Sequence, residues 1–129
     1  MNVDSWQSQL RKGAAELVVL SLLRGRQLYG VELLDRAGGS GGIVSDGTLY
    51  PLLARLEREG KLAAEWLLPD EAKIPRKYYR LTAEGEALVA EMQPVWRAFS
   101  AFVDAAIEER KHDPAPARPR RSLAERARA

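Results

Sequence analysis

The chain has 129 residues, of which 46% are hydrophobic and 29% charged, and it contains no cysteine. This composition is typical of one soluble domain with its own core, and it excludes disulfides and thiolate metal sites. No run of about 18 apolar residues is present, and neither a membrane span nor a signal peptide is expected. The net charge of +2 is uneven, because residues 113–129 balance to +3 and residues 1–112 to −1.

The first predicted helix covers residues 6–24 and ends at Gly25. Its apolar positions at helical spacing are Leu10, Ala14, Leu17, Val18 and Ser21, and three more leucines broaden the apolar face near the end. We expect more than one neighbour to bury this helix. A second, shorter helix is predicted over residues 28–39, with Leu28, Val31 and Leu34 facing inward. The glycine-rich residues 38–42 are expected to form a flexible loop.

A third helix is predicted from Ser45, a favourable N-cap residue, to Gly60. Its inward face is a run of four leucines at helical spacing: Leu49, Leu52, Leu53 and Leu56. At about 100° per residue, the positions opposite these leucines point straight outward. These positions are Gly47, Pro51, Ala54 and Arg58. Mostly small residues at the centre of the outer face would let this helix approach a partner closely.

The period then changes to that of strands. Residues 61–69 and 74–82 are predicted to form a β-hairpin with residues 70–73 as its tip. On one face, Tyr79 and Leu81 are expected to pack on the helices. The other face would carry Arg76, Tyr78 and Arg80, with Lys73 and Lys77 near the tip.

Thr82 is predicted to cap a last, long helix. Its apolar residues follow steps of four and three, which is a heptad seam: Leu88, Met92, Val95, Phe99, Phe102 and Ala106. A second stripe, Val89, Trp96 and Val103, runs beside it. Two stripes exceed what a small body needs, and we interpret the surplus as a surface for a second subunit. The alternative is a helix that merely lies across its own core. Pro94 is expected to kink this helix.

Three helices followed by a hairpin is the order of a winged helix-turn-helix. The predicted fold is therefore mostly α with a small β-hairpin, which is the wing. Residues 1–82 would form the DNA-binding domain, residues 83–112 a dimerisation helix, and residues 113–129 a disordered tail rich in Arg, Pro and Ala.

The third helix would then lie in the major groove, where Ser45, Thr48 and Tyr50 near its N-terminus are placed for bases and phosphates. The basic wing would reach phosphates or the minor groove. A solvated basic strand on an ordinary hairpin remains the alternative for the wing.

The stretches "LYGVELL", "SDGTLYPLLARLEREGKL" and "PRKYYRLTAEG" resemble the PadR family of bacterial transcriptional regulators from about residue 12 to residue 92. The resemblance implies a dimeric repressor of the short-tailed branch, whose long C-terminal helix packs with the first helix of the partner. Its implied DNA-facing set is Ser45, Thr48, Tyr50, Lys73, Arg76 and Lys77. Such a dimer is expected to bind double-stranded DNA at a palindromic operator. Pro94 and the Arg-rich tail depart from the family pattern.

Some PadR-like regulators place an aromatic residue of this helix at the dimer centre, where paired rings hold flat hydrophobic effectors. The resemblance therefore implies an effector site at Trp96, with Trp6 lining or capping it. The alternative is that Trp96 only fills the interface. A small flat hydrophobic or phenolic effector would release the operator.

Enzyme motifs are not convincing. "GGSGG" satisfies the G-x-S-x-G pattern, but a helix precedes it and the only histidine is His112. One histidine without cysteine does not build a usual zinc site, so no metal, cofactor or catalytic residue is predicted. The predicted function is a cytoplasmic, sequence-specific repressor that acts as a homodimer. The alternative is a winged-helix module for protein interaction only, which a shallow salt dependence of DNA binding would favour.

Overall fold

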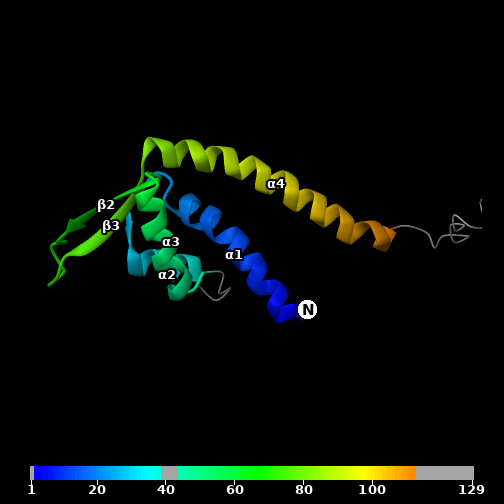
Figure 1. Ribbon diagram of the computed structural model, residues 1–129, viewed down its shortest axis with the longest axis horizontal. Coiled ribbons are helices and arrows are strands. Elements are labelled where there is room, and N and C mark those ends of the chain that lie inside the picture. The colour runs from blue at the N-terminus through cyan, green and yellow to red at the C-terminus, as the bar shows by residue number, and fades with distance from the viewer. Residues whose placement is uncertain (1, 39–43, 113–129) are drawn as a thin grey trace, which may run out of the picture. The chain divides into compact units, whose positions relative to one another are not determined.

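The computed structural model describes residues 2–38 and 44–112. The elements in chain order (Figure 1) are α1 (Val3–Leu22), β1 (Leu28–Tyr29), α2 (Gly30–Gly38), α3 (Asp46–Arg58), β2 (Leu62–Leu67), β3 (Arg76–Leu81) and α4 (Ala83–His112). The chain consists of two structural units, residues 1–96 and residues 97–129. Most of the predicted glycine-rich loop and the whole predicted tail lie outside the described residues.

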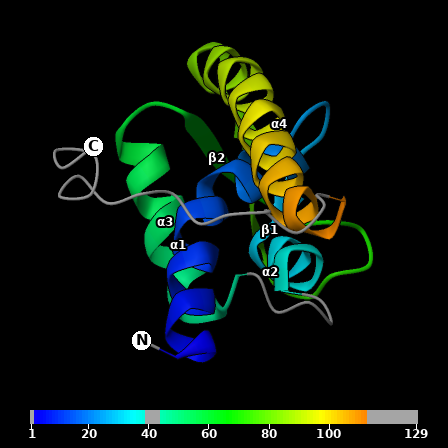
Figure 2. The same cartoon turned by 90° about the vertical axis from the view of Figure 1, so that its right-hand side faces the viewer.

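The first unit is built around the three helices α1, α2 and α3 (Figure 2). Each of them contacts the other two. β2 contacts α3, so the sheet adjoins the helical core. The core consists almost entirely of aliphatic side chains, and its fully buried members include Leu20, Leu23, Leu33, Leu49, Leu53, Leu56 and Val89. The order of three helices and a hairpin confirms the predicted winged helix-turn-helix.

The prediction for α3 is confirmed in detail. All four leucines of its inward face are buried, and the four outward positions are exposed. The helix ends at Arg58, and Gly60 follows with a φ of 76°, which a residue with a side chain rarely adopts. The regular spacing of the leucines and the glycine after the helix were therefore enough to predict which face of α3 is buried and where the helix ends.

The inward faces predicted for the first two helices were partly wrong. In α1, Ala15, Val19 and Leu20 are buried, whereas Leu10 is exposed, so the buried face is shifted by about one residue. In α2, Leu33 and Ala37 are buried and Val31 is exposed. The periodicity of α1 did not select one face, because apolar residues surround much of its circumference. In α2 the error came from extending the helix back to residue 28.

The sheet has three strands in the order β1–β3–β2, one more than predicted. β2 and β3 form the predicted hairpin, with Leu62 opposite Leu81 and Ala64 opposite Tyr79. β1 is only two residues long and pairs with β3, which places Leu28 opposite Tyr79 and Tyr29 opposite Tyr78. Residue 28 therefore belongs to a strand and not to the second helix.

α4 begins as predicted, because Thr82 Oγ1 accepts a hydrogen bond from the Gly85 backbone N–H at 3.1 Å. The helix continues through Pro94. Val89, from the second stripe, is fully buried in the core, and the seam residues Leu88 and Met92 pack against that core. Further along, Val95, Phe99 and Phe102 are exposed. The first part of the predicted seam is thus covered by the chain itself.

Within the described residues, no helix is both long and apolar enough to cross a membrane.

Candidate nucleic-acid interface

The N-terminus of α3 presents a small group of polar side chains. Ser45 occupies the N-cap position, but its hydroxyl donates to Thr48 Oγ1 at 3.3 Å and makes no capping bond to the helix backbone. Asp46 Oδ1 instead accepts a hydrogen bond from the Gly47 N–H at 2.7 Å. Two hydroxyls that were predicted to face DNA therefore lie together at this end of α3, beside a carboxylate that sequence reasoning did not consider.

Tyr50 follows one turn later and is 43% exposed. Its ring lies against the first residue of α2, Gly30: a Cβ atom built on Gly30 would be 2.9 Å from Tyr50 Cε1 and 3.2 Å from its hydroxyl oxygen. The absence of a side chain at Gly30 therefore allows Tyr50 to occupy this position.

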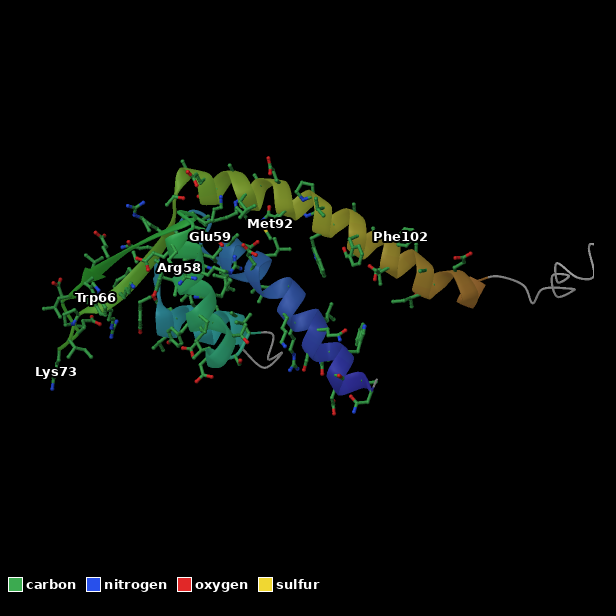
Figure 3. All side chains as sticks on the ribbon, viewed as in Figure 1. Arg58, Glu59, Trp66, Lys73, Met92 and Phe102 are labelled. Carbon is green, nitrogen blue, oxygen red and sulfur yellow. The ribbon has the colours of Figure 1, made fainter. Side chains whose placement is uncertain are left out.

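An open groove of about 800 Å³ lies between α3, the β1–α2 junction and the hairpin. Four residues of the predicted DNA-facing set line it, namely Tyr50, Lys73, Arg76 and Lys77. Ser45 and Thr48 are not among the described residues that line it. Figure 3 shows Trp66 and Lys73 at the far end of the hairpin, where the Lys73 side chain points away from the helices. Residues from α3 and from the wing, which are distant in sequence, therefore line the same groove.

Arg76 is held by an aromatic neighbour on the outer face of the sheet. Its guanidinium carbon lies 4.5 Å from the centre of the Tyr29 ring, a cation–π distance. The Tyr29 ring in turn meets Tyr78 edge to face, with ring centres 5.5 Å apart. The predicted outer face of β3 is confirmed, whereas the aromatic partner from β1 was missed.

Lys77 lies one ladder pair from the end of the hairpin, and its side chain is engaged with α3. It is opposite Trp66 in the ladder and shares a face with Tyr79, so it points toward α3. Its Nζ atom donates to Glu57 Oε1 at 3.2 Å and lies 5.5 Å from the centre of the Tyr79 ring. The hydrogen bond to Glu57 raises the pKa of Lys77, and burial raises the pKa of Tyr79.

Arg55 lies on the flank of α3 and is engaged with two carboxylates. It contacts Glu59 at 3.0 Å and Glu16 of α1 at 3.3 Å. The hydrogen bond to Glu59, followed by that to Glu16, raises the pKa of Arg55. This arrangement joins α3 to α1 and leaves the outward positions such as Ala54 and Arg58 as the exposed centre of α3.

The residues predicted for dimerisation and effector binding lie on two helices. Trp96 on α4 is 41% exposed and Trp6 on α1 is 55% exposed. Among the described residues, no group of three or more His, Cys, Asp or Glu side chains is arranged to hold a metal ion.

Sequence reasoning missed Tyr29, Gly30 and Glu57 as members of this region. For Tyr29 and Gly30, the only sequence signal of a role in this region was a weak one, namely an aromatic residue followed by a glycine. Nothing in the spacing of α3 distinguished Glu57 from its other charged residues, because its role depends on the wing folding back beside the helix.

Comparisons with known proteins agree on one family. Residues 19–91 match the model of the transcriptional regulator PadR-like family. Over 83 residues, the chain is 34% identical to the transcriptional regulator Rv3488 of Mycobacterium tuberculosis, and the match covers 64% of this chain and 76% of the relative.

Solved structures give the same result. A PadR family transcriptional regulator from Eggerthella lenta is similar with a TM-score of 0.68 and 38% identity, covering 82% of this chain and 92% of that one. A PadR-like transcriptional regulator from Bacillus cereus has a TM-score of 0.71 and 28% identity, covering 78% and 97%. The predicted resemblance is confirmed: the chain belongs to the PadR-like family of transcriptional regulators, and this membership implies a DNA-binding regulator.

Proposed function

We propose that the protein is a sequence-specific transcriptional repressor that binds a palindromic operator as a homodimer in the cytoplasm. The observation that carries the DNA-binding part is the groove between α3 and the wing, because Tyr50 of α3 and Lys73 and Arg76 of the wing line one open space. In this proposal α3 is the recognition helix in the major groove, and the wing contacts phosphates beside it.

The chemistry of the side chains suggests which parts of the DNA each element contacts. Ser45, Thr48 and Tyr50 have hydroxyl groups that donate and accept, so they suit base edges and phosphate oxygens near the start of α3. Lys73 and Arg76 carry positive charge on the wing and suit phosphates or the minor groove. Lys77 belongs to the same set, although its bond to Glu57 reduces the charge that it offers.

Dimerisation is supported by exposed apolar side chains on α4. Val95, Trp96, Phe99, Phe102 and Ile107 are all exposed in the single chain. Monomeric proteins rarely leave such a long apolar stripe uncovered. A two-fold dimer would place two recognition helices on half-sites about one helical turn apart, roughly 10 base pairs.

The experiment that tests this function is selection of duplexes from a random library, followed by a reporter assay with the selected site in the promoter. We expect an inverted repeat and reduced transcription when the protein is present. Changes at Thr48 or Tyr50 should alter the selected sequence. Recovery of no preferred duplex would contradict the proposal and favour a protein-interaction module.

An effector site at Trp96 is the second part of the proposal. In a dimer through α4, an exposed indole and its symmetry mate would offer a slot for a flat apolar or phenolic ligand. Such a ligand would release DNA only if it preferred a dimer spacing that differs from the one DNA selects. The test is tryptophan fluorescence during titration with flat dyes, because Trp96→Ala should remove most of the quenching. Equal quenching in the wild type and the variant would exclude Trp96.

A further inference from the structure

The junction between β1 and α2 touches both DNA-facing elements. Tyr29 ends β1 and Gly30 begins α2, so the two residues are adjacent in the chain. Tyr29 lies under the guanidinium of Arg76 on the wing, and Gly30 lies against the ring of Tyr50 on α3. Both residues also line the groove.

The backbone of this junction is fixed from two sides. β1 pairs with β3, which sets Tyr29 opposite Tyr78 and two residues from Arg76 in the ladder. On the other side, the Tyr29 N–H donates to Glu32 Oε1 at 3.2 Å, which ties the strand to the first turn of α2. A displacement of this junction would therefore move the supports of Arg76 and Tyr50 together.

We infer that the Tyr29–Gly30 junction is a positioning element that sets the place of the wing's Arg76 and of Tyr50 on the recognition helix. The inference rests on the proposed function and extends it to two residues outside the predicted DNA-facing set. Tyr29 acts by holding the Arg76 side chain through the face of its ring, which limits the conformations that the arginine must give up on binding a phosphate. Gly30 acts by leaving space for the Tyr50 ring.

Tyr29 acts through a cation–π contact and Gly30 through the absence of a side chain, so their substitutions have different expected effects. Tyr29→Leu removes the ring face and should weaken DNA binding by about two- to tenfold. Tyr29→Phe keeps the ring face and should retain the wild-type affinity. Gly30→Ala should fold, because the atoms it would displace are at the far end of the Tyr50 side chain, which is partly exposed, and not in the backbone. It should change base preference at the positions that Tyr50 selects.

Double-mutant cycles test the inference. The probe is the duplex that the wild-type protein recovers from a random library, with an unrelated duplex as reference. In an Arg76→Ala background, Tyr29→Leu should cause no further loss of affinity. In a Tyr50→Ala background, Gly30→Ala should cause no further change in base preference. Gly13→Ala on α1 is the matched glycine control, since nothing lies within 4 Å of a Cβ atom there.

Full additivity in both cycles would overturn the inference. It would mean that Tyr29→Leu and Gly30→Ala have the same effect whether or not Arg76 or Tyr50 is present, as general damage to the fold would. Failure of Tyr29→Phe to retain affinity would likewise overturn the role of the ring face. A wild-type protein that binds no duplex would overturn the proposed function and the inference with it. That outcome is distinct, because it appears before any variant is made.

Discussion

The pair formed by Lys77 and Glu57 joins a lysine of the predicted DNA-facing set to a carboxylate of α3. The Nζ–Oε1 distance of 3.2 Å joins the wing to α3, and both side chains remain partly exposed. Such a pair contributes little to stability at the surface, so its main effect is on the local charge. Glu57 offsets the charge that Lys77 would offer to DNA.

We therefore predict that Glu57→Gln strengthens binding to all DNA sequences and steepens the dependence of affinity on salt. The reason is that Lys77 becomes free to pair with a phosphate, which adds about one unit to the charge that enters the salt slope. The measurement is DNA affinity at several salt concentrations for the wild type and Glu57→Gln. Unchanged affinity and slope would show that the ion pair lies outside the DNA interface.

The raised pKa values of Tyr79 and Lys77 also determine how the stability of the fold should depend on pH. Both groups have a pKa raised in the folded state, by burial for Tyr79 and by the bond to Glu57 for Lys77. The folded protein thus holds both protons more tightly than the unfolded chain. This contribution is fully present below the unfolded pKa values of about 10 and is lost as the pH rises through the folded values.

We expect the thermal midpoint to fall as the pH rises above about 10, and Tyr79→Phe to remove part of that fall. Thermal unfolding across the alkaline range measures both. A variant whose midpoint falls as steeply as that of the wild type would show that the Tyr79 proton is not involved.

The role of a residue could be predicted from the sequence when it followed from the pattern of a single helix or strand. It could not be predicted when it required a contact between two separate elements. The outward face of α3 followed from its leucine spacing alone. The contact of Arg76 with Tyr29 joins residues 47 positions apart and depends on the register of β1 with β3. The partner of Lys77 depended in the same way on how the wing lies beside α3.

At the scale of elements, Thr82 connects two parts of the first unit. Its hydroxyl shares its single proton between the carbonyl oxygens of Gly60 and Lys61, at 2.6 Å and 3.1 Å, and accepts a hydrogen bond from the Gly85 N–H. It therefore ties the segment after α3 to the start of α4.

We predict that Thr82→Ala lowers the free energy of unfolding by about 1 kcal/mol or more, because it removes an N-cap and leaves half-buried carbonyl groups with one bond fewer. Thr82→Ser keeps the hydroxyl and should lose much less. Urea denaturation of the two variants measures the difference. Equal losses would assign the effect to the methyl group and not to the hydrogen bonds.

Elements with a strict pattern were predicted better than elements with a diffuse one. α3 and the hairpin had clear periods of 3.6 and 2, and their buried faces were confirmed, whereas the two strands, Leu62–Leu67 and Arg76–Leu81, are shorter than predicted. β1 was missed because two residues carry no period, and its identity as a strand comes from pairing with β3. The face of α1 was ambiguous because its apolar residues are spread around the helix.

At the scale of the whole molecule, the exposed apolar stripe of α4 predicts a homodimer. Phe99 and Phe102 are 59% and 73% exposed in the single chain. Phe99→Asp would place a charge in the dimer interface, which costs several kcal/mol when the charge is unpaired. Ala101→Asp is the control, because residue 101 lies two positions from Phe99 and thus far around the helix from the stripe.

We expect the wild type and Ala101→Asp to sediment as dimers at micromolar concentration and Phe99→Asp to sediment as a monomer. A monomeric wild type would contradict dimerisation through α4. A dimeric Phe99→Asp would locate the interface elsewhere.

The most direct test of DNA recognition through α3 and the wing is the salt dependence of affinity for the selected operator, measured for the wild type and for the double variant Lys73→Ala/Arg76→Ala. We expect the double variant to bind more weakly and its salt slope to be shallower by about two units, because two phosphate contacts are lost. Arg11→Ala/Lys12→Ala removes the same charge from α1 and should leave the slope nearly unchanged. A double wing variant with the affinity and salt slope of the wild type would contradict the assignment of the wing to DNA.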